Sequence, residues 1–167
     1  MKNMKFWLWL FVSFSVIFYS CKKEEKTEDD EYVVNDIDLL PSNAGKTKLK
    51  NDQQYVSILH ANLFQEALSA NEIFEISQCI ESIGDKEIAR EVIISNFMNE
   101  SGVKMPSDSL MRNDLDEFIV QTYNRFFVRN PTEAEKAYFK NYIGSNPNVT
   151  PELVYFAFSL SNEYLYY

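Results

Sequence analysis

Six helix-start signals recur between residue 51 and the last residue of this 167-residue sequence, and they constrain its fold more than any other feature. Three of them are capping boxes, in which an N-cap side chain and a Glu or Gln three positions later each bind the other's backbone N–H. The three boxes are Asn51/Gln54, Ser69/Glu72 and Thr132/Glu135. The other start signals are Asp85, the Pro106-Ser107-Asp108 break, and Thr150 followed by proline at the first helical position.

Behind each start signal, apolar residues recur at three- and four-residue spacing, which is typical of a helix with one buried face. We predict helices at about 52–68, from residue 70 to Ile83, at 86–99, 108–128 and 133–143, and from residue 151 onward. A break at 112–114 is an alternative for the fourth helix. The last helix is apolar almost all round and should be central. Since no stretch alternates with period two, the sequence predicts an all-α domain of about six helices over 51–167.

Details of these helices are also predicted by the pattern. The inward residues of the first helix should include Leu59 and Ala67, and those of the third should include Ile88 and Val92. Gly84 stands where a left-handed residue often ends a helix.

The first twenty residues have the three parts of a secretory signal peptide. Residues 1–5 (MKNMK) are basic, residues 6–19 are apolar and uncharged, and Ser20 is a small residue before Cys21. The alternative is an uncleaved membrane anchor. Fourteen helical residues cover roughly 21 Å, whereas the hydrocarbon core is about 30 Å thick, so we favour the signal peptide.

A cysteine directly after the cleavage site resembles bacterial lipoprotein precursors. That resemblance implies that Cys21 becomes the first residue and carries acyl chains that anchor the protein in a membrane. The charges that follow, Lys22, Lys23, Glu24 and Glu25, are similar to the export signal of surface-exposed lipoproteins of the Bacteroidota. The resemblance implies a lipid-anchored protein of the outer membrane that faces the cell surface, with the periplasmic face as the alternative. The charges can also form a solvated tether, and the two interpretations can hold together.

Residues 21–50 do not show the helical pattern. We predict that the charged part up to Glu31 is a tether and that Tyr32–Leu40 is an extended arm or a short turn. Residues 41–50 are predicted to be a loop. Removal of residues 1–20 leaves 14 basic and 25 acidic side chains, a net charge of −11. Such a surface repels phosphates, so we expect no nucleic-acid partner.

Residues 118–164 contain an Arg-x-Pro corner (Arg129 to Pro131), the aromatic pair Tyr138-Phe139 and a closing Ser-x-Glu-aromatic motif that ends in Glu163-Tyr164. This pattern resembles the helical module shared by phycobilisome linker domains and a family of bacterial surface proteins. The resemblance implies a role in interaction or scaffolding, without catalysis. Val128 stands where that module often has glycine.

The corner residues also have a structural interpretation. Arg129 should lie at the end of one helix, near the first turn of the next, which carries Glu135. A guanidinium can bind such a carboxylate with two hydrogen bonds, and Glu163 is a second candidate partner. We therefore expect Arg129, Glu135, Glu163 and Tyr164 to fix the corner or to contact a partner.

Residues capable of chemistry are few. Cys79 lies in an apolar-periodic stretch and is predicted to be buried, and His60, the only histidine, to be a half-exposed helix residue. No motif for a metal, a phosphate or a nucleophile is present, so we expect neither catalytic residues nor a cofactor or metal.

Two surface features suggest glycans. Asp108-Ser109-Leu110 resembles the O-glycosylation acceptor of exported Bacteroidota proteins, which would place a glycan on Ser109 in an exposed loop; the alternative is a helix N-terminus. Tyr155, Tyr164, Tyr166 and Tyr167 could offer aromatic faces to a glycan. The sequence thus predicts a lipid-anchored, non-catalytic interaction domain with an envelope protein as partner, and a glycan-binding accessory lipoprotein as the alternative.

Overall fold

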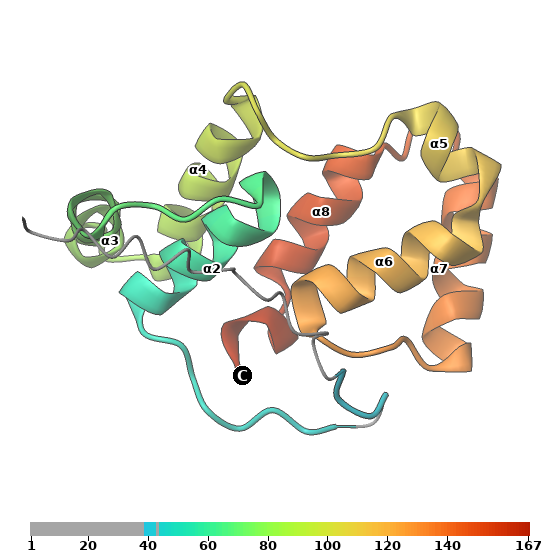
Figure 1. The fold of residues 1–167 in the computed structure, drawn as a ribbon, viewed down its shortest axis with the longest axis horizontal. Coiled ribbons are helices and arrows are strands. Elements are labelled where there is room, and N and C mark those ends of the chain that lie inside the picture. Colours follow the sequence, from blue (N-terminus) through green and yellow to red (C-terminus); the bar gives the residue numbers. More distant parts are fainter. Residues whose placement is uncertain (1–38, 43) are drawn as a thin grey trace, which may run out of the picture. The chain divides into compact units, whose positions relative to one another are not determined.

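The computed structural model describes residues 39–42 and 44–167, which are all-helical apart from turns, loops and two isolated β-bridges (Figure 1). The α-helices in this part of the chain are α2 (Asp52–Phe64), α3 (Ala70–Ser82), α4 (Lys86–Asn99), α5 (Asp108–Asn113), α6 (Leu115–Phe127), α7 (Glu133–Ser145) and α8 (Pro151–Leu160). A short 3-10 helix, η2 (Glu163–Leu165), follows α8. The predicted all-α fold is confirmed.

The helix starts are where the capping signals placed them. All three capping boxes form with both hydrogen bonds, at the starts of α2, α3 and α7. Asp85, Ser107 and Thr150 cap α4, α5 and α8 through their side chains. The described part of the chain has seven α-helices rather than six, because Asp114 accepts from the Glu117 backbone N–H (3.0 Å) and starts α6 separately from α5.

Helix ends were predicted less well than helix starts. α2 ends at Phe64 because Gln65 adopts the left-handed conformation (φ 59°), so Ala67 lies outside the helix and is exposed. α3 ends through Ile83 in an extended conformation, and Gly84 does not have the left-handed backbone predicted for it. The left-handed glycine is instead Gly102 (φ 105°).

The buried face of α4 is rotated from the predicted one. Ile88 and Val92 are 53% and 47% exposed, whereas Ala89 and Ile94 are buried together with the predicted Ile93 and Phe97. On α3, Cys79 is exposed, so its predicted burial is wrong. Apolar spacing alone allowed either face of α4, and packing against α2, α3 and α8 selected the observed one.

Helix α8 lies between α4 and α6, as its apolar composition predicted (Figure 1). α2 packs against α3 and α4, and α6 packs against α7, α8 and η2. Val154, Tyr155 and Phe158 of α8 are all buried. The core therefore lies on both sides of α8, which packs against α4 of the first group (α2, α3, α4) and against α6 of the second (α6, α7, η2).

Three predicted features lie outside the described residues. These are the signal peptide (1–20), Cys21 with the export signal (22–25), and the arm up to Asp38. In the part of the chain that the structure does describe, none of the helices combines the length and apolar character needed to span a bilayer.

Candidate functional site

The Arg-x-Pro corner forms where α6 turns into α7. α6 ends at Phe127, and Val128 adopts a left-handed conformation (φ 54°) with its N–H bonded to the Asn124 carbonyl. This turn directs Arg129 back beneath the helix end, where it is 5% exposed. The corner is therefore built by a backbone conformation that L-residues adopt rarely.

The Arg129 guanidinium uses all five of its N–H donors. Nε and one terminal nitrogen donate to the two carboxylate oxygens of Glu163, each at 2.7 Å. The terminal nitrogens also donate to the two oxygens of Glu135, at 3.0 and 2.8 Å, and one donates to the Asn130 carbonyl at 3.2 Å. One planar cation thus ties together the end of α6, the first turn of α7 and the start of η2. Glu135 was the predicted partner of Arg129, and Glu163 was the second candidate.

Glu135 also takes part in the N-terminal cap of α7. Its carboxylate accepts from the Thr132 backbone N–H (2.7 Å) and hydroxyl (2.9 Å), which closes the capping box of α7. Hydrogen bonds from Arg129 lower the pKa of Glu135 to about 2, and those from Thr132 act in the same direction. With the Lys46 ammonium 3.7 Å from Glu163, the corner holds two cations and two carboxylates.

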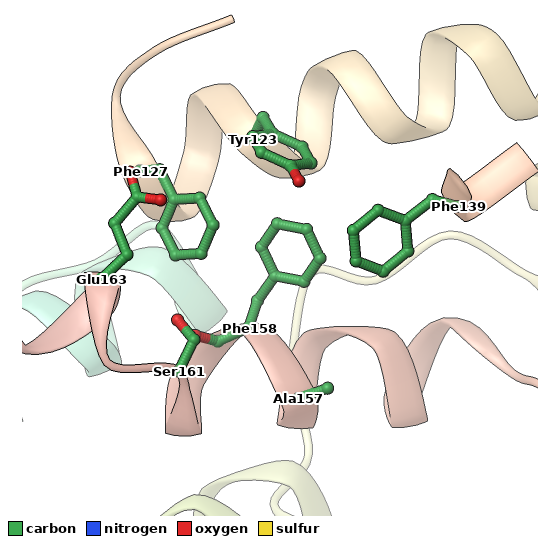
Figure 2. A pocket seen from close by; sticks show the side chains of 7 residues that line it. All are labelled: Tyr123, Phe127, Phe139, Ala157, Phe158, Ser161 and Glu163. Atoms are coloured by element: carbon green, nitrogen blue, oxygen red, sulfur yellow. The ribbon is translucent and has the colours of Figure 1, made fainter. Parts of the chain in front are cut away.

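An aromatic hollow of about 240 Å³ adjoins this corner. It is lined by Tyr123, Phe127, Phe139, Ala157, Phe158, Ser161 and Glu163 (Figure 2). The Phe158 ring stands in the middle of Figure 2, with Phe127 on one side and Phe139 on the other, at centroid distances of 4.8 and 5.3 Å. The hollow therefore offers aromatic walls to whatever enters it.

Two polar residues that line the hollow, Glu163 and Ser161, are already engaged within the protein. Glu163 binds Arg129, and the Ser161 hydroxyl donates to the Phe158 carbonyl (2.8 Å) and accepts from the Tyr164 backbone N–H (3.3 Å). Arg129 lies over the Tyr123 ring, 5.0 Å from its centroid. Burial raises the pKa of Tyr123, so this phenol keeps its proton near neutral pH. Such a hollow suits an apolar or aromatic side chain better than a ligand that needs several new hydrogen bonds.

The aromatic surface continues from the hollow onto α7. The ring of Phe139 is 5.3 Å from that of Tyr138, which stacks in parallel on Tyr142 at 6.1 Å. Tyr138 and Tyr142 are 62% and 48% exposed. Their spacing of four residues on a helix was visible in the sequence, but their exposure depended on how α7 packs.

The predicted glycan residues do not share one surface. Tyr155 and Tyr164 are buried, Tyr166 is half-buried and Tyr167 is 43% exposed. Tyr164 is a core residue whose hydroxyl accepts from the Asn62 amide (3.0 Å), and burial raises its pKa. Ser109 is exposed, but it lies in the first turn of α5 and not in a loop, with Ser107 as the cap.

Sequence reasoning missed a second arginine clamp. Arg112 donates to the backbone carbonyls of Ile143, Asn146, Pro147 and Val149, at distances from 2.7 to 3.4 Å. It thereby satisfies carbonyls at the end of α7 and in the turn that leads to α8. No motif marks this contact, because it joins residues more than thirty positions apart.

His60 is half-exposed, as predicted. Its ring stacks on Phe64 (centroids 4.3 Å apart) and its Nδ1 lies 3.0 Å from the Glu66 carbonyl oxygen. Within residues 39–42 and 44–167, His, Cys, Asp and Glu side chains form no group of three or more that could hold a metal ion.

Comparison with known proteins leaves the site to be interpreted from its own geometry. No protein family, no curated protein and no solved structure matches the chain. The resemblances to lipoprotein precursors and to the linker-type helical module stay predictions from the sequence.

Val128 gives a first test of the corner. Replacing it with glycine should raise the free energy of unfolding by about 1 kcal/mol, because glycine adopts φ 54° without the clash that a β-branched residue has there. Urea denaturation of Val128→Gly against wild type measures this change. Val128→Ala is the matched control and should gain less, since alanine keeps a Cβ. A less stable glycine variant would contradict the left-handed geometry.

Acid should weaken the corner in a defined range. The pKa of Glu135 is about 2 in the folded protein and near 4.5 in the unfolded chain, so its contribution is complete above pH 4.5 and is lost as the pH falls toward 2. We expect a loss of about 2 kcal/mol from this group, because its partial exposure reduces the effect. Urea midpoints at pH 6 and pH 3 measure the loss, and Glu135→Gln should show a smaller difference between the two.

Proposed function

We propose that this protein is anchored in the outer membrane by acyl chains on Cys21 and that its helical domain is a non-catalytic module that binds another envelope protein. The observation that carries the binding role is the continuous aromatic surface from Tyr142 and Tyr138 through Phe139 into the hollow. Tyrosine and phenylalanine are enriched in protein interfaces, and tyrosine is enriched among the residues that dominate binding energy.

The corner beside the hollow supports the same proposal. A binding surface works best when the groups under it are already fixed in place. Arg129 fixes Glu135 on α7 and Glu163 on η2, and the charges of Arg129 and Lys46 together balance those of the two carboxylates. The part of the wall that Glu163 forms is therefore held in place before a side chain enters.

Detergent pull-down with tagged variants tests the binding role. Wild type should recover an envelope protein in stoichiometric amount, and Tyr138→Ala/Tyr142→Ala should recover at least tenfold less of it. Phe74→Ala, which removes a 55% exposed aromatic from α3, is the matched control and should behave as wild type. Recovery of the wild-type protein alone under mild detergent, or equal recovery by all three, would contradict the proposal.

The anchor has its own test. The Cys21→Ala variant should be absent from the membrane fraction. The intact mass of the wild-type mature protein should match a chain that begins at Cys21 and carries acyl chains. Replacing residues 22–31 with a neutral linker should reduce surface labelling while membrane attachment persists. A Cys21→Ala variant that fractionates like wild type would refute lipidation.

The same aromatic surface can be used to test glycan binding, the alternative role, against protein binding. Two of the four tyrosines suggested for it lie in the core, and Glu163 and Ser161 of the hollow already make hydrogen bonds within the protein. Binding of the purified protein to envelope polysaccharide, lost in Tyr138→Ala/Tyr142→Ala, would favour the glycan over a protein partner.

A further inference from the structure

Residues 46–50 (KTKLK), which we call the lysine strap, hold the C-terminal residues in an extended pairing. The Lys48 backbone N–H donates to the Tyr167 carbonyl (3.2 Å) and the Tyr167 N–H donates back to Lys48 (2.9 Å). The Lys50 N–H donates to the Leu165 carbonyl (2.9 Å). Leu49 and Tyr166 form an isolated antiparallel bridge, so the predicted loop at 41–50 includes an ordered segment.

Each lysine of the strap lies over an aromatic ring. Alternate residues of an extended chain point to the same side, so Lys46, Lys48 and Lys50 share one face. Their ammonium groups lie 5.3 Å from the Phe127 centroid, 4.9 Å from that of Tyr167 and 4.2 Å from that of Tyr164, respectively. Such cation–π contacts hold the strap against the protein without a large apolar interface.

The strap reaches the aromatic hollow through Lys46. This side chain contacts Glu163 (3.7 Å) and Phe127, and both residues line the hollow. Glu163 is also the first residue of η2, whose last residue, Leu165, pairs with Lys50. A movement of the strap therefore acts on the same short turn that forms one wall of the hollow (Figure 2).

The strap has the features of a segment that opens before the helices do. It is held by three backbone hydrogen bonds, and Leu49 and Tyr167 are 57% and 43% exposed. Segments with few buried contacts and exposed backbone bonds open locally at a fraction of the global stability. Lys46 and Lys50 are the exceptions, because the Lys46 side chain is 6% exposed, and Lys50 is 7% exposed and donates to the Tyr164 carbonyl.

We propose that the lysine strap is a releasable latch that sets the shape of the aromatic hollow. This inference rests on the proposed binding role of the hollow. With the strap closed, Lys46 holds Glu163 and Phe127 in the wall of the hollow. With the strap open, η2 and the residues after it loosen, and only Arg129 then holds Glu163 in that wall. Because coupling between two equilibria is reciprocal, a side chain bound in the hollow favours the closed strap.

Hydrogen exchange on the full-length protein in detergent tests the latch. In Lys46→Ala/Lys48→Ala, the amides of Tyr164 and Leu165, which bond within the C-terminal turn (3.0 and 3.2 Å), should exchange at least tenfold faster than in wild type. Amides in α2 and α4 should stay within twofold. Thr47→Ala, an exposed position between the two lysines, is the matched control and should match wild type.

The methyl resonance of Ala157, which lines the hollow, reports whether the loosening reaches it. It should shift in Lys46→Ala/Lys48→Ala and not in Thr47→Ala. Any of three results would overturn the latch. These are unchanged exchange at Tyr164 and Leu165, equal acceleration of exchange in every helix, and an Ala157 methyl resonance that does not shift. These measurements need no partner, so a failed latch is distinguishable from a failed pull-down of the wild-type protein.

Discussion

Replacing Arg129 with alanine is expected to lower the free energy of unfolding by about 3 kcal/mol, among the largest effects of any single change in this protein. The substitution removes all five hydrogen bonds that Arg129 makes at the corner and leaves Glu135 and Glu163 facing each other, with Lys46 in contact with Glu163. The value lies at the low end for a broken buried ion pair, because both carboxylates keep about 30% of their exposure. Urea denaturation at pH 7 measures it.

Two variants make this expectation specific to the guanidinium. Arg129→Lys should recover only part of the loss, because an ammonium cannot bind two carboxylates with two hydrogen bonds each. Lys136→Ala removes a positive charge from the same helix α7 without breaking the corner, and should cost less than about 0.5 kcal/mol. The deficit of Arg129→Ala should shrink toward pH 4, where protonation relieves the repulsion. A deficit below 1 kcal/mol at pH 7 would show that water replaces Arg129.

Structural features that depend on residues close together in the sequence could be predicted from it. A capping box joins residues three positions apart, so the starts of α2, α3 and α7 followed from Asn51, Ser69 and Thr132. The corner followed for a similar reason, since Arg129 and Glu135 lie six positions apart across one turn. Its third member, Glu163, is 34 positions away and was predicted only as an alternative partner.

The sequence could not predict what depends on packing between distant segments. Ile88 and Val92 have the spacing of a buried face, yet α4 buries Ala89 and Ile94 in its packing against α2, α3 and α8. The strap joins residues 48–50 to residues 165–167, and nothing near Lys50 indicates that Tyr164 will lie beneath its ammonium group. The hollow needs α6, α7, α8 and η2 in place at once.

Replacing Phe158 with alanine should cost about 3–5 kcal/mol of unfolding free energy, because it removes the ring on which four others pack. Phe158 is 3% exposed, and its centroid lies 4.8 to 6.1 Å from those of Tyr123, Phe126, Phe127 and Phe139. Phe158→Leu keeps most of the volume and should cost about 1.5 kcal/mol or less. Phe74→Ala removes the same side chain from an exposed place on α3 and should lie within about 0.5 kcal/mol of wild type.

The same variant shows whether the aromatic walls keep their places. If the corner and the strap hold Phe127 and Phe139 apart, Phe158→Ala leaves an apolar space that a small aromatic molecule can fill. Benzene should then raise the melting temperature of Phe158→Ala and leave that of wild type and Phe158→Leu nearly unchanged, since bound ligand stabilises the folded state. A loss near 3 kcal/mol without a benzene effect would mean that the walls close in. The hollow would then depend on Phe158 for its shape, and the corner would not be enough to hold it open.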